Sequence, residues 1–484
     1  MNDQVLTDIK RRSVSGVIAL TSRTAFLQII SFVGTFLLTI FLSPETFGVF
    51  FVVTAMVSFL NYFSDIGLAA ALIQKNDLIT RKDLVTTFTI QQILIGILVI
   101  IALASTQFVS RWYRLDQEGI FLYQALVISF VLSSLKTIPS ILLERELDFR
   151  RLVIPQIVEV FLFYLIAVAL AMAGYGIRTF TFAVLVRGVA GLVVMYIVRP
   201  WIPAFGIHRE SARQLLSFGV PFQMNSALAL VKDDLFILFL GKILPYSQVG
   251  YIGWAKKWSE APLRLIMDSI VKVTFPAYSR LQQHPEKLAR AVEKALFFLT
   301  LLIVPISLGM AFSVEPLIDL FPQYGKWEPA LTSFYLFVFA SGVAGLSTPL
   351  INALNAIGKI TITLRFMILW TVLQWLLAPI LIQQIGYDGF AYAVAIMAVT
   401  VIGVVWVAQR YISFSLWKNV LPSLIGGAVM TVFFITTRDM LTGAWIGLFF
   451  YLTFGGGLFA ASVYFLYRAK LTGEIRSIVV LMKN

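Results

Sequence analysis

Residues 244–272 of the chain read LPYSQVGYIGWAKKWSEAPLRLIMDSIVK. This largely apolar stretch should cross a membrane, yet it carries five charged residues of alternating sign, each four positions after the one before. They are Lys256, Glu260, Arg264, Asp268 and Lys272, with Lys257 beside the first. Positions four apart are neighbours on one side of an α-helix. Because an ionised side chain near the bilayer centre is costly unless it is paired or hydrated, the row predicts a charged helix face that lines an aqueous cavity.

The rest of the sequence is typical of an integral membrane protein. Hydrophobic residues make up 59% of the 484 residues and charged residues 13%, and the mean hydropathy is +0.87, whereas soluble domains carry about 25% charged residues. A helix needs roughly 20 apolar residues to span the bilayer, and such stretches follow one another from end to end. No hydrophilic segment is long enough for a separate soluble domain. We therefore predict an all-α polytopic membrane protein.

Charge and cysteine content exclude several other classes. The net charge of +13 is better explained by basic cytoplasmic loops than by nucleic acid as a partner, because the chain has no basic soluble domain and no binding motif. The absence of Cys excludes disulfides, Cys-rich zinc sites and thiol catalysis. There is also no nucleophile–base pair, phosphate-binding Gly loop or metal-ligand spacing, so we expect no catalytic residues, no metal and no cofactor.

Hydropathy and helix-breaking residues predict fourteen membrane spans. Their limits are 15–42, 47–73, 84–105, 120–143, 152–173, 177–198, 215–241, 248–275, 291–312, 330–355, 361–382, 389–409, 419–437 and 444–467. With a cytoplasmic N-terminus, one set of loops holds most of the 38 Lys and Arg residues. The opposite set holds only Arg111, Arg114, Arg178, Lys242, Lys326 and Arg438. This bias follows the positive-inside rule and predicts that both termini are cytoplasmic. A helix lying on the membrane surface is the alternative for 248–275.

An internal repeat predicts how the spans are grouped. The segment LSPETFGVF at 42–50 resembles LPYSQVGYI at 244–252, an offset of 202 residues, and Asp65 then falls near the place of Asp268. Six spans separate the copies, so both halves keep one orientation. We predict an N-terminal six-helix lobe at 1–198, a C-terminal six-helix lobe at 199–410, and two extra transmembrane helices with a cytoplasmic tail at 411–484. Transporters built from such repeats place their site near the midplane between the lobes.

Charged residues inside the predicted spans are the candidate site. The predicted substrate-binding residues are Arg23, Lys232, Lys256, Lys257 and Arg264. The predicted coupling or gating ion pairs involve Asp65, Asp233, Asp234, Glu260 and Asp268. Cations slightly outnumber acids within the spans. Because phosphates attract fixed Arg and Lys side chains, the expected ligand is an anionic headgroup.

Structural roles are the alternative for several of these charges. Arg264 could be neutralised by Glu260 and Asp268. The adjacent residues 232–234 point in directions about 100° apart around a helix, so they could lock the seventh span to the eighth. Elsewhere, Arg187 could pair with Glu159, whereas Lys136 could extend to the lipid headgroups.

Two further residue types in the eighth span suggest transport. Pro262 removes a backbone donor and should kink or loosen the helix, and broken helices are common at transport sites. Trp254 and Trp258 flank the charged row and could stack on sugar rings. Membership of the interfacial aromatic belt is the alternative for both.

Three segments resemble polysaccharide transporters of the Wzx flippase type. The first is FSDIGLAAALIQ at 63–74, which is similar to the family's second-span signature. The second is LERELDFRRL at 143–152, which is similar to its basic loop after the fourth span, and the third is SPETFG at 43–48, which is similar to its first turn. The likeness in span pattern extends over nearly the whole chain. This family belongs to the multidrug/oligosaccharidyl-lipid/polysaccharide exporter superfamily.

The resemblance implies a function as well as a fold. It implies two six-helix lobes plus two extra helices, and flipping of undecaprenyl-pyrophosphate-linked oligosaccharide from the inner to the outer leaflet of the plasma (inner) membrane by alternating access. Such flippases serve export of lipopolysaccharide, O-antigen or exopolysaccharide and are not enzymes. Arg23 lies where related flippases carry a cavity Arg, so the resemblance gives it a substrate-binding role. Membrane lipids and the polysaccharide polymerase machinery are the further expected partners.

Two other functions stay open. A multidrug or organic-cation exporter of the same superfamily would favour acidic cavity residues, and the cationic excess argues against it. A membrane glycosyltransferase or polymerase usually needs a sizeable loop or a catalytic acid cluster. The longest outward-facing loops, about 106–119 and 313–329, are too short to form a domain.

Overall fold

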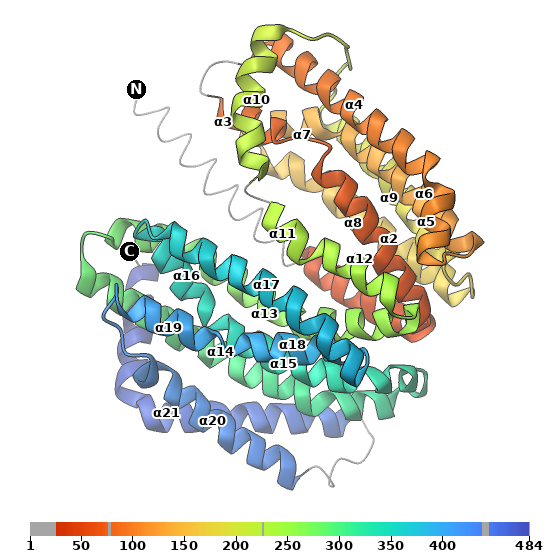
Figure 1. Ribbon diagram of the computed structural model, residues 1–484. Coiled ribbons are helices and arrows are strands. Elements are labelled where there is room, and N and C mark those ends of the chain that lie inside the picture. The colour runs from red at the N-terminus through yellow and green to blue at the C-terminus, as the bar shows by residue number, and fades with distance from the viewer. Residues whose placement is uncertain (1–25, 76–78, 225–226, 438–444, 484) are drawn as a thin grey trace. The chain divides into compact units, whose positions relative to one another are not determined.

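The computed structural model describes residues 26–75, 79–224, 227–437 and 445–483 (Figure 1). In these ranges the chain is helical and contains no β-strand, which confirms the predicted all-α fold. Contacts divide the chain into two compact units, Met1–Gly250 and Tyr251–Asn484, called unit 1 and unit 2 below. The predicted lobes, which end at 198 and 410, stay a prediction.

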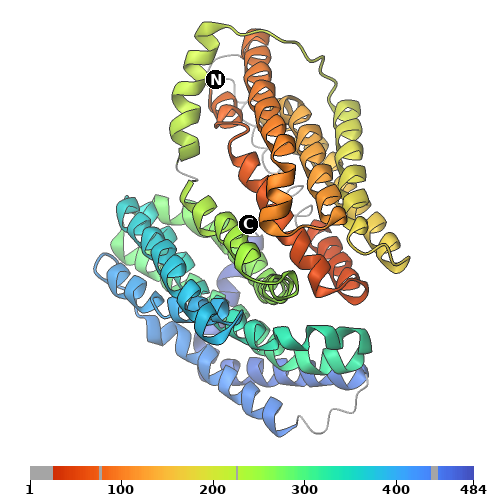
Figure 2. The same ribbon diagram turned by 45° about the vertical axis from the view of Figure 1, so that its right-hand side comes forward.

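Unit 1 starts, in its described part, with the helix Phe26–Phe41. It continues with α2 (Pro44–Tyr62), α3 (Leu68–Gln74), α4 (Arg81–Ala104), α5 (Thr106–Tyr113), α6 (Gln117–Leu135), α7 (Thr137–Arg145), α8 (Phe149–Met172), α9 (Arg178–Val198), α10 (Arg209–Met224), α11 (Ala227–Lys232) and α12 (Asp234–Ile243). Helix α9 packs against α8 and α6, and α12 packs against α2 (Figures 1 and 2). Helices α10 to α12 are therefore part of the packing of unit 1.

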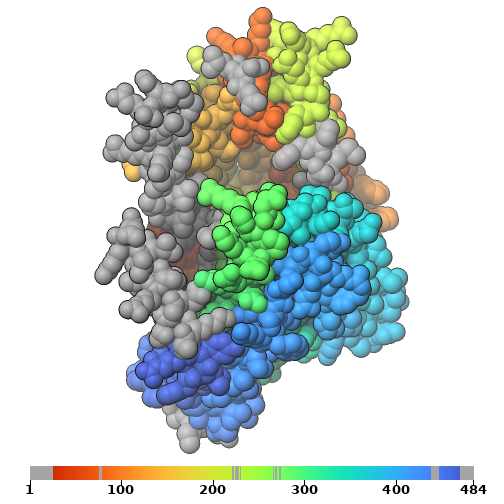
Figure 3. All heavy atoms as spheres, turned by 90° about the vertical axis from the view of Figure 1, so that its left-hand side faces the viewer, coloured from red at the N-terminus to blue at the C-terminus, as the bar shows by residue number. Residues whose placement is uncertain are grey.

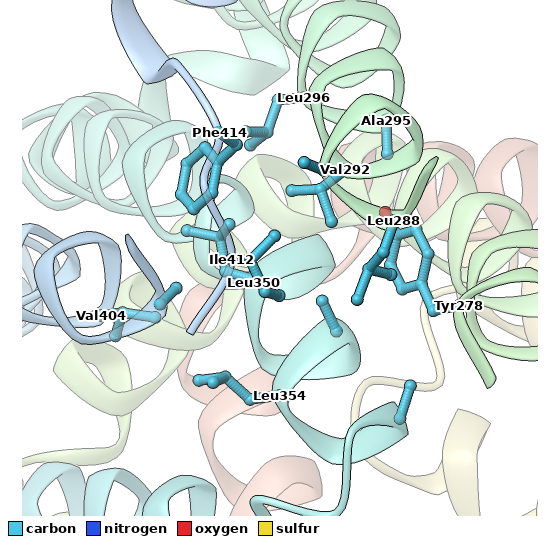
Figure 4. Packing of buried hydrophobic residues seen from close by; sticks show 14 residues of the cluster. Tyr278, Leu288, Val292, Ala295, Leu296, Leu350, Leu354, Val404, Ile412 and Phe414 are labelled. Carbon is cyan, nitrogen blue, oxygen red and sulfur yellow. The ribbon is translucent and has the colours of Figure 1, made fainter. Parts of the chain in front are cut away.

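Unit 2 is built around a long helix, α14. Helix α13 (Tyr246–Leu281) begins in unit 1 and continues into unit 2. After it come α14 (Pro285–Leu320), the 3-10 helix η1 (Pro322–Ala330), α15 (Leu331–Gly345), α16 (Ser347–Ala356), α17 (Ile360–Ile385), α18 (Gly389–Ala398), α19 (Val401–Gln409), α20 (Leu416–Thr436) and α21 (Trp445–Lys483). One core cluster joins Val292 of α14 to Tyr278, Leu350 and Phe414, which come from three other parts of the unit (Figure 4).

Helices α20 and α21 correspond to the two extra helices expected at the C-terminal end of the chain. They pack on each other and on α14. Met430 and Phe434 of α20 form an apolar cluster with Leu308 of α14 and with residues of α21. The buried hydroxyl of Ser423 also donates to Thr300 Oγ1 at 3.2 Å. Both helices are therefore attached to unit 2 through α14.

Eleven helical segments in the described part of the chain are long and apolar enough to cross a membrane. The other three predicted spans are not among these eleven. The first overlaps the shorter apolar helix Phe26–Phe41. The seventh is divided among α10, α11 and α12, and the eighth lies in α13, which contains the charged row. The chain is thus a multi-pass membrane protein, and the number fourteen stays a prediction.

The predicted second span, 47–73, is two helices rather than one. Helix α2 ends at Tyr62 and α3 begins at Leu68, with Ile66 and Gly67 in left-handed conformation at φ 47° and 73°. A Cβ atom at Gly67 would collide with the backbone of Gly219, and one at Gly219 would lie 2.6 Å from the carbonyl oxygen of Ile66. The break is therefore fixed by a backbone-to-backbone contact with α10, for which glycine is needed on both sides.

The predicted fourth span is also divided, because α6 ends at Leu135 and α7 begins at Thr137. Helix α4 supplies polar side chains beside this break. Gln91 Nε2 donates to Thr137 Oγ1 at 3.0 Å, and Gln92 Nε2 donates to Ser134 Oγ at 3.2 Å. Polar side chains often join helices in this way inside membranes.

Arg145, the last residue of α7, has a structural role at the end of α3. Arg145 Nη1 donates to the carbonyl oxygens of Leu72 at 2.8 Å and Lys75 at 2.6 Å. The last carbonyls of a helix have no partner within the helix, and a cation there also favours the helix dipole. Arg145 therefore caps α3 from another part of the chain.

Replacing Arg145 by alanine is expected to destabilise unit 1 by about 1.5–3 kcal/mol, the range for hydrogen bonds made by a charged group. The measurement is the melting temperature of the detergent-purified protein. Arg145→Lys should recover part of the loss, because a single ammonium cannot reproduce the guanidinium geometry. Arg150→Ala, which removes an exposed Arg from the start of α8, is the matched control. Equal melting temperatures for Arg145→Ala and Arg150→Ala would contradict the capping role.

Candidate functional site

The charged row of α13 is partly ordered by ion pairs along the helix. Arg264 Nη2 lies 2.7 Å from Glu260 Oε2, and Lys256 Nζ lies 4.0 Å from Glu260 Oε1. Glu260 therefore stands between two cations, as the four-residue spacing predicts. Asp268 and Lys272 belong to the same helix, but their side chains lie outside the described part of the structure.

Exposure distinguishes Arg264 from the other members of the row. Its side chain is 70% exposed, whereas those of Lys256 and Glu260 are 32% and 25% exposed. Lys257 is also exposed. In Figure 3, green atoms from the region of α13 and the start of α14 form part of one face of the molecule. A guanidinium has five N–H donors, so an Arg264 that donates to Glu260 still has donors for an anionic ligand.

An aromatic core holds the first part of α13 in unit 2. Trp254 is buried and stacks on the buried Trp327 of η1, with ring centroids 5.3 Å apart and an angle of 12° between the planes. Phe334 of α15 packs against Trp254 from another side. Trp254 is therefore a packing residue, which contradicts both interpretations of it that the sequence suggested, a sugar-stacking surface and a membrane-interface position. Its contribution to the site is to fix the rotation of α13 and thereby the direction of the row.

Pro262 does not interrupt α13, and the kink or loosening that the sequence suggests at this residue stays a prediction. The helix runs without interruption from Tyr246 to Leu281 and contains both Pro262 and Pro276. Prolines are tolerated inside membrane helices when neighbouring groups satisfy the freed backbone. The charged row is thus presented by one continuous helix.

The charged triplet Lys232-Asp233-Asp234 marks the junction of two short helices. The predicted span 215–241 is wrong as a single helix, because α11 ends at Lys232 and α12 begins at Asp234. A cation at a helix C-terminus and an acid at a helix N-terminus both favour the helix dipole, which explains the break at this point. Asp233, between the two helices, is exposed, whereas Lys232 and Asp234 are half-buried. Their predicted roles in binding and coupling stay proposals.

Asp65 lies at the break between α2 and α3. Its two carboxylate oxygens accept from the backbone N–H of Ala69 at 3.2 and 3.1 Å. In the described part of the chain, therefore, this side chain binds the first turn of α3, where an acid is favoured. Whether it also takes part in coupling stays a prediction. Arg23, the other residue singled out near the N-terminus, lies outside the described residues.

A second group of charges lies inside unit 1. Glu159 of α8 forms an ion pair with Lys136, at the break between α6 and α7, and lies 3.8 Å from Arg187 of α9. The pairing of Arg187 with Glu159 is confirmed, whereas the expectation that Lys136 extends to the headgroups is wrong. Gly191 makes the room, because a Cβ atom there would collide with the Glu159 carboxylate. The sequence signal for this cluster was one acid facing two cations on neighbouring spans.

The described charges along the row of α13 are mostly cationic. Along the row of α13 the described cations are Lys256, Lys257 and Arg264, against a single acid, Glu260. In the same described part of the chain, no three His, Asp or Glu side chains converge in a way that could hold a metal ion. A cationic helix face of this kind can bind phosphate or carboxylate groups.

Known proteins are similar to the chain in sequence and in fold. The family described as "Polysaccharide biosynthesis protein" matches residues 37–332. The succinoglycan biosynthesis transport protein ExoT of Rhizobium meliloti (strain 1021) is 23% identical over 392 residues, which cover 79% of this chain and 77% of ExoT. A probable lipid II flippase MurJ of Bdellovibrio bacteriovorus is 25% identical over 207 residues, which cover 40% of each chain.

Two solved structures share the fold. A lipid II flippase MurJ in an inward closed conformation has a TM-score of 0.77 at 16% identity, and the match covers 93% of this chain and 99% of that one. An inward-facing MATE family multidrug resistance transporter of the MOP superfamily has a TM-score of 0.58 at 17% identity, with 81% of this chain and 98% of that one covered. The chain therefore has the fold of MurJ and MATE transporters.

Proposed function

The chain belongs to the polysaccharide biosynthesis protein family, and from that premise we propose that it flips undecaprenyl-pyrophosphate-linked oligosaccharide from the inner to the outer leaflet of the plasma membrane. It is a multi-pass membrane transporter with a MurJ-like fold and not an enzyme. Beyond the family and the fold, we propose the substrate, the alternating-access mechanism, the inner membrane as the location, and cytoplasmic termini.

The observation that carries the substrate assignment is the exposed Arg264 on a cationic face of a predicted membrane helix. A pyrophosphate is an anion with several acceptor oxygens, and Arg binds phosphate through two parallel N–H donors. Lys256 and Lys257 lie two turns before Arg264 on the same helix and supply further positive charge. An organic-cation exporter would instead need an acidic face. Among the described side chains of the row, Glu260 is flanked by the cations Lys256 and Arg264.

Glu260 has a specific part in the proposed mechanism. Without substrate it pairs with Arg264 and Lys256, which lowers the cost of holding these cations inside the membrane. When the pyrophosphate arrives, the donors of Arg264 that are not used by Glu260 bind the phosphate oxygens. The lipid tail stays in the bilayer throughout. The predicted contributions of Arg23 and Lys232 to binding, and of Asp65, Asp233, Asp234 and Asp268 to coupling, complete the proposal.

The first test is the melting temperature of the detergent-purified protein with two ligands, an undecaprenyl-pyrophosphate oligosaccharide and a lipophilic organic cation. A ligand that binds only the folded state stabilises it by about 2.7 kcal/mol at a hundred times its dissociation constant. We expect the lipid-linked glycan to raise the melting temperature of the native protein and to have little effect on Arg264→Ala. A rise with the organic cation alone would replace this proposal with the multidrug exporter.

A further inference from the structure

Two exposed cations of unit 2 rest on aromatic rings, on the side that the charge bias assigns to the cytoplasm. The guanidinium carbon of Arg410, directly after α19, lies 3.5 Å from the centre of the Trp406 ring. The Nζ atom of Lys359, directly before α17, lies 5.0 Å from the centre of the Tyr411 ring. Such contacts are attractive within about 6 Å. We call these four residues the basic–aromatic patch.

The turn between α16 and α17 fixes the place of Lys359. Helix α16 ends at Ala356, and Gly358 has the left-handed backbone, with φ 77°, that commonly follows a helix end. The N–H of Lys359 donates to the carbonyl oxygen of Leu354 at 2.8 Å and closes the turn. Leu354 is fully buried in the core cluster of unit 2 (Figure 4). The turn therefore holds Lys359 at the surface, where it is exposed.

The same core cluster holds the ring that Lys359 contacts. After α19, Ile412 and Phe414 are both buried in this cluster (Figure 4), whereas Tyr411 before them is exposed. The core thus holds the two segments that supply the patch, one on each side of the contact between Lys359 and Tyr411.

The patch carries positive charge that no acid compensates. The sequence from 351 to 437 contains four cations and one acid, Asp388, which follows the opposite end of α17. Glu293 of α14 accepts from the backbone N–H of the turn after α19 at 2.8 Å. Within the described residues, neither Lys359 nor Arg410 forms an ion pair. Both cations are therefore available to an anionic ligand.

An apolar surface leads up to both cations. On α19, Ile402 and Trp406 precede Arg410 by eight and four positions, which places them on one side of the helix. They are 71% and 57% exposed. On α17, Ile360 follows Lys359 directly and is 67% exposed. Both helices belong to segments long and apolar enough to cross a membrane, so these side chains are available to lipid acyl chains.

We propose that the basic–aromatic patch binds an anionic phospholipid of the cytoplasmic leaflet. Lys359 and Arg410 hold the phosphate through charge-assisted hydrogen bonds, and the acyl chains lie along Ile402 and Trp406. A cation over a ring face keeps its N–H donors for phosphate oxygens, and basic groups at the cytoplasmic ends of membrane helices bind anionic headgroups. The patch shares no residue with the charged row of α13, so this proposal does not rest on the flippase function.

The test is the binding of phosphatidylglycerol with brominated acyl chains to the detergent-purified protein, measured by quenching of tryptophan fluorescence. Phosphatidylcholine with the same chains is the comparison without net charge, and the native protein should bind it more weakly. The double variant Lys359→Gln/Arg410→Gln should bind phosphatidylglycerol about 25-fold more weakly, since each basic residue near an anionic lipid surface contributes a factor of about five. Its binding of phosphatidylcholine should not change.

Three variants make the result specific. Arg280→Gln/Lys287→Gln removes two other exposed cations of unit 2 and should bind phosphatidylglycerol like the native protein. Lys359→Arg/Arg410→Lys exchanges the two cations and should recover most of the binding. Trp406→Phe should remove most of the quenching that phosphatidylglycerol adds over phosphatidylcholine. Equal losses in the two Gln pairs would overturn the proposal, and so would equal affinities of the native protein for the two lipids.

Arg264→Ala separates the patch from the proposed substrate site. This variant should bind phosphatidylglycerol normally while it loses its response to the lipid-linked glycan. Loss of phosphatidylglycerol binding in Arg264→Ala, with none in Lys359→Gln/Arg410→Gln, would assign the lipid to α13 and overturn the patch. If the patch variants respond as expected while the glycan does not bind, the lipid site stands and the substrate assignment fails.

Discussion

A chain with Glu159 replaced by alanine is expected to unfold at a markedly lower temperature than the native protein. The substitution leaves Lys136 and Arg187 beside each other inside unit 1 with no carboxylate between them. The side chains of Lys136 and Glu159 are only 13% and 12% exposed, so water cannot replace the lost partner. Removing one member of a buried ion pair costs about 3–5 kcal/mol, and the melting temperature in detergent is the measurement.

Two further variants distinguish this effect from simple loss of packing. The double variant Lys136→Gln/Glu159→Gln removes both charges while retaining most of the volume, and should be more stable than Glu159→Ala. The control Glu286→Ala breaks the exposed pair with Arg290 in unit 2, whose side chains are 91% and 70% exposed. Exposed pairs contribute about 0–1 kcal/mol, so this variant should melt close to the native protein. Equal melting temperatures for Glu159→Ala and the Glu286→Ala control would contradict the stabilising role of the buried ion pair.

Replacing Arg264 by alanine is expected to reduce transport of the lipid-linked oligosaccharide by about 10- to 150-fold while leaving the folded protein in the membrane. The range corresponds to about 1.5–3 kcal/mol for hydrogen bonds to a charged group. Stability should change little, because the Arg264 side chain is 70% exposed. The measurement is translocation by protein reconstituted into vesicles, with the melting temperature recorded for the same preparation.

The same assay carries its own controls. Arg264→Lys retains the charge but not the two parallel donors, and should transport at an intermediate rate. Arg280→Ala removes an exposed Arg from the end of the same helix, outside the row, and should transport normally. Full transport by a stable Arg264→Ala protein would remove Arg264 from the site and leave the row with a structural role.

Helix content and the pairing of charges along α13 could be predicted because they depend on local spacing. Apolar stretches of sufficient length favour helices in a membrane, and a four-residue spacing brings Glu260 to Arg264 on any helix. The partnership of Glu159 with Arg187 was also foreseeable, since an acid inside a membrane span needs a cation.

The breaks in the helices could not be predicted, because each depends on a distant part of the chain. The left-handed backbone at Ile66 and Gly67 is held by Gly219, which is remote in sequence. Pro262 lies inside a continuous helix, since the surroundings of a membrane helix decide whether a proline is tolerated. Within the site, the packing of Trp254 on Trp327 sets the rotation of α13. The exposure of Arg264 follows from that rotation.

The contact of Gly67 with Gly219 has a consequence for how the protein is synthesised. A ribosome that has translated as far as Val198 has produced α2 to α9, together with Arg145, so the cap on α3 can already form. The surface that holds Ile66 and Gly67 is not yet made, because it belongs to α10. The bend between α2 and α3 is therefore completed late, after six predicted spans have entered the bilayer. A nascent chain that stalls before Gly219 presents an unfinished second span to the translocation and quality-control machinery.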